Sequence, residues 1–245
     1  MSNLENTNSP VPVSPQPLRT WDFMETAFVS LIAYGVYTLT SGLTLTIMLA
    51  MHDGAKTLSP AQIQAYGAPY IVASPLTIAV LWVAIRMAGR DFAEYLALNW
   101  PSSSELLRAL AIAALLLLAE SLAVSLVGTD VTLADPYVSA KQAGRLLIFL
   151  IGGCIAAPVM EEFVVRGFMF RGWSQSFLGP VGSIVVTSVL WAMIHTQYDW
   201  FGRFWIFVTG LALGHFRWRS NSTWLTVMVH SAINIFISFA TGLQF

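Results

Sequence analysis

Three ionisable side chains lie within one apolar segment of this sequence. Glu161, Glu162 and Arg166 belong to the stretch PVMEEFVVRG at 158–167, which is flanked by long runs of apolar residues. On a helix, Glu162 and Arg166 are four positions apart and share a face, where they can form an ion pair. Glu161 is rotated by about 100° and stays outside that pair. The spacing predicts a structural ion pair beside a carboxylate that is available for chemistry.

Two other apolar segments carry histidines. His195 ends the run WAMIH at 191–195, and His230 lies four residues before Asn234 in a later run. A lone histidine in a membrane helix usually forms a hydrogen bond to a neighbouring helix. Two histidines together with an Asn on the same helix face and a spare carboxylate instead favour a functional site.

These side chains suit the hydrolysis of an acyl bond by water. A carboxylate assisted by an imidazole, here Glu161 with His195, can deprotonate water. His230 and Asn234 can donate hydrogen bonds to the oxyanion of a tetrahedral intermediate, and each such donor contributes about 3 kcal/mol. Alternatively, Glu161, His195 and His230 could hold zinc and leave a position for water. The sequence has no His-Glu-x-x-His motif, and no Gly-x-Ser-x-Gly that would indicate a serine nucleophile.

The elements that must position these residues are membrane helices. Only 10% of the 245 residues are charged, whereas a soluble domain has roughly 25%. A net charge of −1 gives no basic surface for nucleic acid, and the single cysteine, Cys154, excludes an intramolecular disulfide. Apolar runs of about 20 residues, which suffice to cross the hydrocarbon as helices, recur along the chain. We expect an all-α transmembrane bundle of about seven helices (six to eight) with a polar intramembrane cavity, at 23–50, 68–88, 105–127, 144–173, 181–198, 203–216 and 222–242.

The chain divides into a short tail and one membrane domain. Residues 1–20 are rich in proline and small polar residues and do not resemble a signal peptide, so we expect a disordered N-terminal tail before a transmembrane domain at 21–245. Loops on the side of the N-terminus carry eight Lys and Arg residues, and loops on the other side carry four. The positive-inside rule therefore predicts a multi-pass protein of the cell membrane with a cytoplasmic N-terminus.

The depths of the candidate residues are compatible with one site. At a rise of 1.5 Å per residue, Glu161 lies about 18 Å from its helix end, His195 about 21 Å and His230 about 12 Å. These residues can share a layer if the helix at 144–173, about 30 residues long, tilts or protrudes from the membrane.

The three motifs at 161–166, 191–195 and 230–234 occur in an order that resembles the CPBP family of intramembrane proteases, which includes CAAX prenyl endopeptidases and bacteriocin-immunity (Abi) proteins. They are similar to the family's Glu-Glu-x-x-x-Arg, Phe-x-x-x-His and His-x-x-x-Asn, with Trp191 replacing Phe as a larger packing residue. The resemblance covers roughly 144–240. It implies a helical bundle whose polar cavity opens to the cytosol and which cleaves a membrane-associated peptide or protein near its C-terminus.

The resemblance also implies a role for each candidate residue. The family has been described as metallo-type and later as glutamate-type. We prefer the glutamate type, with no cofactor, over a zinc site. A non-catalytic immunity or scaffold protein of the same family is the alternative function, and a proton-coupled transporter is disfavoured because the sequence has no internal repeat. The roles carried over are water activation by Glu161 and His195, an oxyanion hole of His230 and Asn234, and structural support by Glu162 and Arg166.

Overall fold

The computed structural model describes residues 20–52, 60–127 and 136–242. The described residues are helical apart from short connections, and no strand occurs among them, so the all-α prediction is confirmed. The predicted tail falls almost entirely on residues 1–19, which lie outside the described part of the chain.

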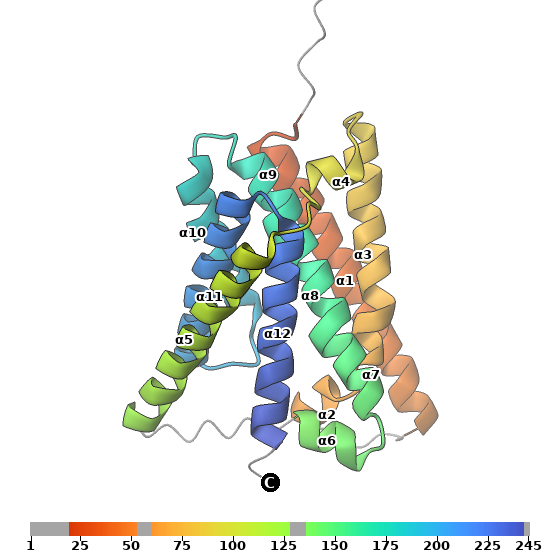
Figure 1. Ribbon diagram of the computed structural model, residues 1–245. Coiled ribbons are helices and arrows are strands. Elements are labelled where there is room, and N and C mark those ends of the chain that lie inside the picture. Colours follow the sequence, from red (N-terminus) through yellow and green to blue (C-terminus); the bar gives the residue numbers. More distant parts are fainter. Residues whose placement is uncertain (1–19, 53–59, 128–135, 243–245) are drawn as a thin grey trace, which may run out of the picture.

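Each of the expected helical segments is present (Figure 1). The segment predicted at 144–173 is one continuous helical rod, Leu146–Trp173. It consists of α7 (Leu146–Ile151), the π-helix η1 (Gly152–Ala156), α8 (Ala157–Glu162), the π-helix η2 (Phe163–Met169) and α9 (Phe170–Trp173). The other long helices are α1 (Phe23–His52), α3 (Ala68–Met87), α5 (Ser103–Val127), α10 (Gly179–Ile194), α11 (Trp200–Ser220) and α12 (Thr223–Gly242), and the short ones are α2 (Pro60–Gln64), α4 (Phe92–Tyr95) and α6 (Pro136–Gln142).

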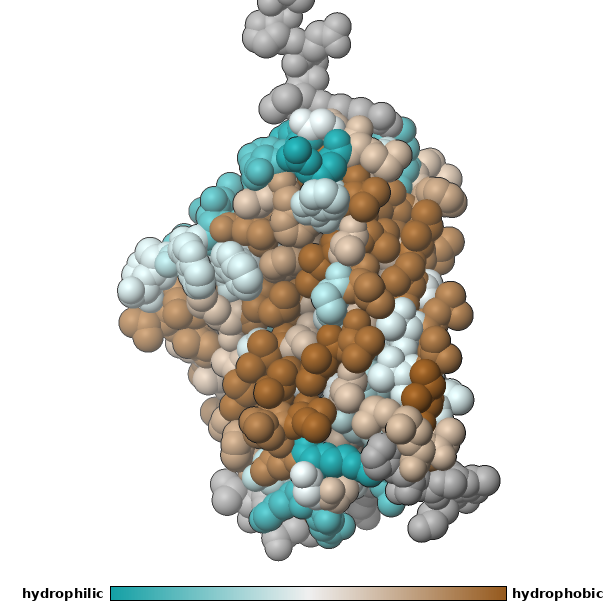
Figure 2. All heavy atoms as spheres, turned by 90° about the vertical axis from the view of Figure 1, so that its right-hand side faces the viewer, coloured by the Kyte–Doolittle hydropathy of each residue, from teal (hydrophilic) through white to brown (hydrophobic). Residues whose placement is uncertain are grey.

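Five of these segments are long and apolar enough to cross a membrane, namely α1, α3, α5, the rod Leu146–Trp173 and α12. The face of the molecule in Figure 2 shows a broad hydrophobic band between hydrophilic side chains at its two ends, as expected for a protein surrounded by lipid. The chain is therefore a multi-pass membrane protein.

The pair α10 and α11 differs from its predicted boundaries. Helix α10 has 16 residues and ends at Ile194 rather than at 198, because His195 leaves the helical conformation. Helix α11 is longer than predicted. Its first turn is capped by Asp199, whose side chain accepts from the Gly202 amide at 2.8 Å, and it ends at Asn221 in the left-handed conformation. With 16 residues, α10 is about 24 Å long, which is too short to cross the hydrocarbon. His195, at its C-terminal end, therefore lies at membrane depth. In Figure 1 the segment joining α10 to α11 stops short of the lower end of α12.

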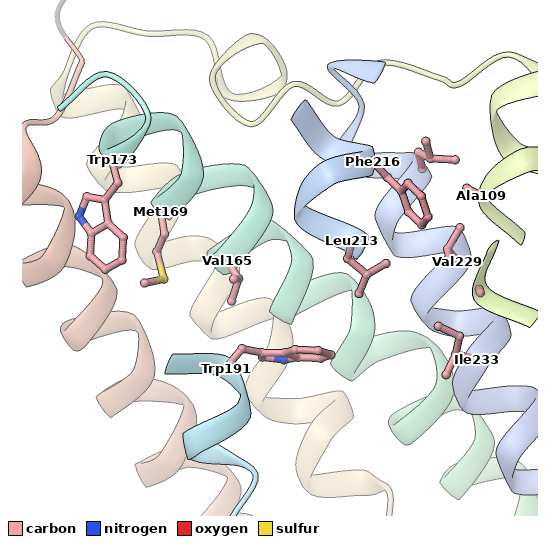
Figure 3. Close-up of a cluster of buried hydrophobic side chains, with 11 residues drawn as sticks. Ala109, Val165, Met169, Trp173, Trp191, Leu213, Phe216, Val229 and Ile233 are labelled. Carbon is pink, nitrogen blue, oxygen red and sulfur yellow. The ribbon is translucent and has the colours of Figure 1, made fainter. Parts of the chain in front are cut away.

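The rod Leu146–Trp173 is the centre of the bundle. Half of its apolar window is buried, compared with 6% for α5. Its residues Val165, Met169 and Trp173 pack in one cluster with Trp191 of α10 and with residues of α11 and α12 (Figure 3). Because the rod is surrounded by other helices, polar groups on it are removed from lipid.

A glycine pair fixes how closely the rod approaches α3. A side chain on Gly152 would place its Cβ 2.2 Å from the carbonyl oxygen of Gly67, and Gly67 itself has a positive φ of 64°. By contrast, a Cβ on the next residue, Gly153, would meet nothing nearer than the Phe149 ring at 3.6 Å. The contact between the start of α3 and η1 therefore requires glycine at 152 but not at 153.

We expect Gly152→Ala to destabilise the protein by about 3 kcal/mol, because the backbones must separate to admit the methyl group. Gly153→Ala is the matched control, and its thermal midpoint should not fall. Thermal unfolding of both variants in the same detergent micelles measures this difference. Equal midpoints would show that the close approach of the two backbones is not needed.

Candidate active site

A buried charge network joins three helical segments at the centre of the bundle. The Glu162 side chain is fully buried, and its Oε1 accepts hydrogen bonds from Arg166 Nη1 and His230 Nδ1, both at 2.9 Å. Arg166 is 1% exposed, and its Nη2 also donates to the Gly210 carbonyl of α11 at 3.3 Å. The predicted Glu162–Arg166 pair is confirmed. Glu162 additionally holds His230 of α12, which the sequence did not indicate.

Glu161 has a different set of neighbours from Glu162. It is half-buried, and its Oε2 accepts a hydrogen bond of 2.7 Å from Trp191 Nε1 on α10. Its other oxygen, Oε1, has no hydrogen-bond partner among the described residues. Glu161 thus stays outside the ion pair, as its rotation on the helix predicts. Trp191, which the sequence suggested only as a larger packing residue, is also a hydrogen-bond donor.

His195 sits at the C-terminal end of α10 with one nitrogen occupied. Its Nδ1 lies 2.7 Å from the carbonyl oxygen of Trp191, one helical turn earlier. Because a carbonyl only accepts, Nδ1 carries the hydrogen in this arrangement, and Nε2 of the neutral ring remains an acceptor. The half-buried imidazole can therefore take a proton at Nε2.

The His230 and Asn234 side chains project from α12 towards the rod. With Nδ1 donating to the Glu162 carboxylate, Nε2 of His230 accepts a hydrogen bond when the ring is neutral and donates one when it is protonated. Asn234 Nδ2 donates to the carbonyl oxygen of Gly153 at 3.0 Å, which leaves its second N–H uncommitted. Gly153 lies in η1, where the widened helical turn disturbs the regular backbone ladder.

Trp191 lies among most of the predicted site residues. Its ring makes edge contacts with the His195 ring at 5.0 Å and with the His230 ring at 5.3 Å between centroids. The Arg166 Cζ atom lies over the same ring, 4.4 Å from its centroid. The structure therefore brings both glutamates, Arg166 and both histidines together around this indole. Asn234 is placed one turn farther along α12, at Gly153.

A small cavity of about 70 Å³ lies against Glu161. This volume is large enough to hold water. Two of its lining residues, Tyr34 and Tyr37, come from α1, while Thr77 comes from α3. These residues give the cavity hydroxyl groups as well as apolar walls.

Sequence reasoning missed the tyrosines around Glu161. Tyr34 and Tyr37 of α1 line the cavity beside its carboxylate, more than 120 positions earlier in the sequence. One signal was available: Tyr34 and Tyr37 are three residues apart on one helix face and lie inside an apolar run. Tyrosine is otherwise enriched at the membrane interfaces.

Residues 143–236 match the family model described as Type II CAAX prenyl endopeptidase Rce1-like. This segment, which is less than half of the chain, is similar to the CPBP/CAAX protease family. It contains every predicted site residue from Glu161 to Asn234. No curated protein and no solved structure matches the chain.

The metal alternative requires Glu161, His195 and His230 to converge. Among the residues that the structure describes, no three His, Cys, Asp or Glu side chains lie close enough to hold a metal ion. The Nδ1 atoms of both histidines are bonded, to the Trp191 carbonyl and to Glu162 respectively, which leaves Nε2 of each ring uncommitted. Such bonds at Nδ1 orient an imidazole for binding a metal through Nε2 as well as for accepting a proton there.

We expect Glu162→Gln to destabilise the protein by roughly 3–5 kcal/mol, because it leaves the Arg166 guanidinium buried without a counter-charge. The double variant Glu162→Gln, Arg166→Met should recover part of this loss, since it removes both charges. Glu161→Gln is the matched control and should unfold like the unmodified protein. Thermal unfolding in micelles provides the measurement, and a Glu162→Gln midpoint equal to that of the control would contradict a structural role for the pair.

Proposed function

We propose that this protein is an intramembrane endopeptidase of the CAAX protease kind, in which Glu161 and His195 activate water and His230 and Asn234 stabilise the oxyanion. The observation that carries the proposal is the environment of Glu161. One of its carboxylate oxygens is uncommitted, and the residue lines a cavity that is large enough to hold water. The family match supports protease activity, and the geometry supports this assignment of roles.

The proposed reaction begins with a water molecule held beside Glu161. The carboxylate, assisted by Nε2 of His195, takes one proton from the water as its oxygen forms a bond to the carbonyl carbon of the scissile peptide. The carbonyl becomes an oxyanion, which accepts hydrogen bonds from Asn234 Nδ2 and from the protonated His230 ring. When the intermediate collapses, the C–N bond breaks and the proton held by Glu161 or His195 passes to the leaving amine.

The positions of the two neighbouring glutamates support different roles. Glu162 is fully buried and bonded to Arg166 and His230, so it is committed to structure. Glu161 is bonded only to a neutral indole donor and keeps an oxygen free. A general base needs a free acceptor within reach of the proton that it removes. Oε2 of Glu162 also has no hydrogen-bond partner, but it is fully buried, whereas the half-buried Glu161 lines the cavity and meets that condition.

The proposed orientation places the N-terminus in the cytoplasm. The start of α1 and the C-terminal ends of α3 and α11 share one end of the bundle (Figure 1). These last turns carry Arg86, Arg217 and Arg219. Cytoplasmic loops are enriched in Lys and Arg, so this end is assigned to the cytoplasm. A membrane-anchored substrate would then enter with its chain end on that side.

Glu161→Gln should reduce peptide hydrolysis by about 10³-fold, because it removes the base while leaving the buried network intact. The assay uses purified protein in liposomes with a prenylated CAAX-type peptide, and product is measured by mass spectrometry. Glu105→Gln, on the exposed first turn of α5, controls for expression and insertion.

A comparison of the membrane proteomes of cells that produce either the unmodified protein or Glu161→Gln identifies natural substrates. Full activity in Glu161→Gln would contradict the proposed base. If a biological phenotype of the protein persisted in Glu161→Gln and His195→Ala with no change in the proteome, the non-catalytic immunity or scaffold alternative would stand instead.

We expect hydrolysis to proceed without zinc. Protein purified to activity should contain well below one zinc per chain, and dialysis against a strong chelator should leave the rate unchanged. Elemental analysis before and after dialysis, with the rate measured on the same samples, tests this expectation. Stoichiometric zinc that is lost together with activity, and restored together with it, would establish the metallo-type reaction.

A further inference from the structure

One residue, Trp191, contacts four of the predicted site residues by four different means, three through its side chain and one through its backbone carbonyl. Its Nε1 donates to Glu161, its carbonyl oxygen accepts from His195, its ring face lies against Arg166, and its ring packs edge-on with His230. It is 4% exposed, so these contacts are shielded from solvent. The family pattern has Phe at this position, which supplies a ring but no N–H donor.

The Trp191 indole lies between Glu161 and Arg166, so that Glu161 bonds to the indole N–H while Glu162 bonds to Arg166. The Arg166 guanidinium packs over the ring face, with its Cζ 4.4 Å from the centroid, and the ring N–H donates to the Glu161 carboxylate at 2.7 Å. Arg166 is thereby shared between the ring and Glu162, to which it donates at 2.9 Å. Glu161 is held by an uncharged donor instead of by the cation. A neutral donor orients a carboxylate without forming the ion pair that would compete with its action as a base.

We propose that Trp191 is a positioning residue for the water-activating pair. Its N–H fixes Oε2 of Glu161 and leaves Oε1 free, beside a cavity that both residues line. Its carbonyl fixes the His195 tautomer whose Nε2 accepts a proton. A single residue thus sets the orientation of both bases. This inference rests on the proposed function, in which Glu161 and His195 act together.

The chain contains a matched control for this role. Trp173 belongs to the same buried cluster as Trp191 (Figure 3), and it is 3% exposed. Its Nε1 also makes one hydrogen bond, to the Phe23 carbonyl oxygen at 3.0 Å, but none to a predicted site residue. Replacement by Phe therefore removes one buried indole hydrogen bond in each case, inside or outside the site.

Trp191→Phe should lower kcat roughly tenfold with KM unchanged, because a hydrogen bond to a carboxylate is lost while the ring and the backbone carbonyl remain. Trp173→Phe should lower the thermal midpoint by about as much as Trp191→Phe does, but it should leave kcat unchanged. A second variant carries β-(3-benzothienyl)alanine at 191, in which sulfur replaces the N–H at nearly constant shape. It should reproduce the kinetic effect without a packing change. Wild-type kcat in both 191 variants, or a rise in KM alone, would overturn the proposal.

A double-mutant cycle separates this inference from the proposed function. If Trp191 acts through Glu161, adding Trp191→Phe to Glu161→Gln should leave the residual rate unchanged. A further tenfold fall in the double variant would mean that Trp191 acts elsewhere. Full activity in Glu161→Gln alone would overturn the proposed base and with it this role of Trp191. Loss in Glu161→Gln with wild-type kcat in Trp191→Phe would overturn only the role of Trp191.

Discussion

The structure depends on one buried carboxylate. An ionised side chain within a membrane helix costs about 2.5–3.5 kcal/mol on insertion scales, so Glu162 can be fully buried only if its charge is matched. Arg166 supplies the charge from one helical turn away, and His230 adds a second hydrogen bond from α12. Arg166 also donates to Gly210 of α11. The Glu162–Arg166 pair and its hydrogen bonds therefore fix the rotation of the rod, α11 and α12 relative to one another. The positions of side chains next to this network, such as Glu161, are consequently fixed as well.

The neighbouring glutamate acquires its properties from that arrangement. Consecutive residues on a helix point about 100° apart, so Glu161 faces α10 and α1 when Glu162 faces α12. The α8 turn that carries both glutamates is bounded by π-helical turns on either side, η1 and η2. Such turns are frequent at functional sites, and here the η1 carbonyl of Gly153 anchors Asn234. The segment therefore combines a rigid charge network with backbone groups that neighbouring helices can use.

Local spacing in the sequence was sufficient to predict the Glu162–Arg166 pair, the shared face of His230 and Asn234, and the helical membrane class. It was not sufficient for contacts between helices. Glu161 and Trp191 are 30 positions apart, and Glu162 and His230 are 68 apart. Whether such residues meet depends on the rotation and vertical offset of each helix, which apolar periodicity does not specify when most faces of a helix are apolar. The end of α10 was predicted four residues too late, at 198, although the apolar run stops at His195 and mostly polar residues follow it.

The tyrosines show most clearly what a motif omits. The family match begins at residue 143, but the cavity beside Glu161 is lined in part by Tyr34 and Tyr37 of α1 and by Thr77 of α3. The remaining lining residues, among them Met160, Trp191 and Ile194, belong to the matched segment. The hydroxyl groups of this cavity therefore come from helices that precede the three motifs, and the motif residues alone do not describe the surroundings of Glu161.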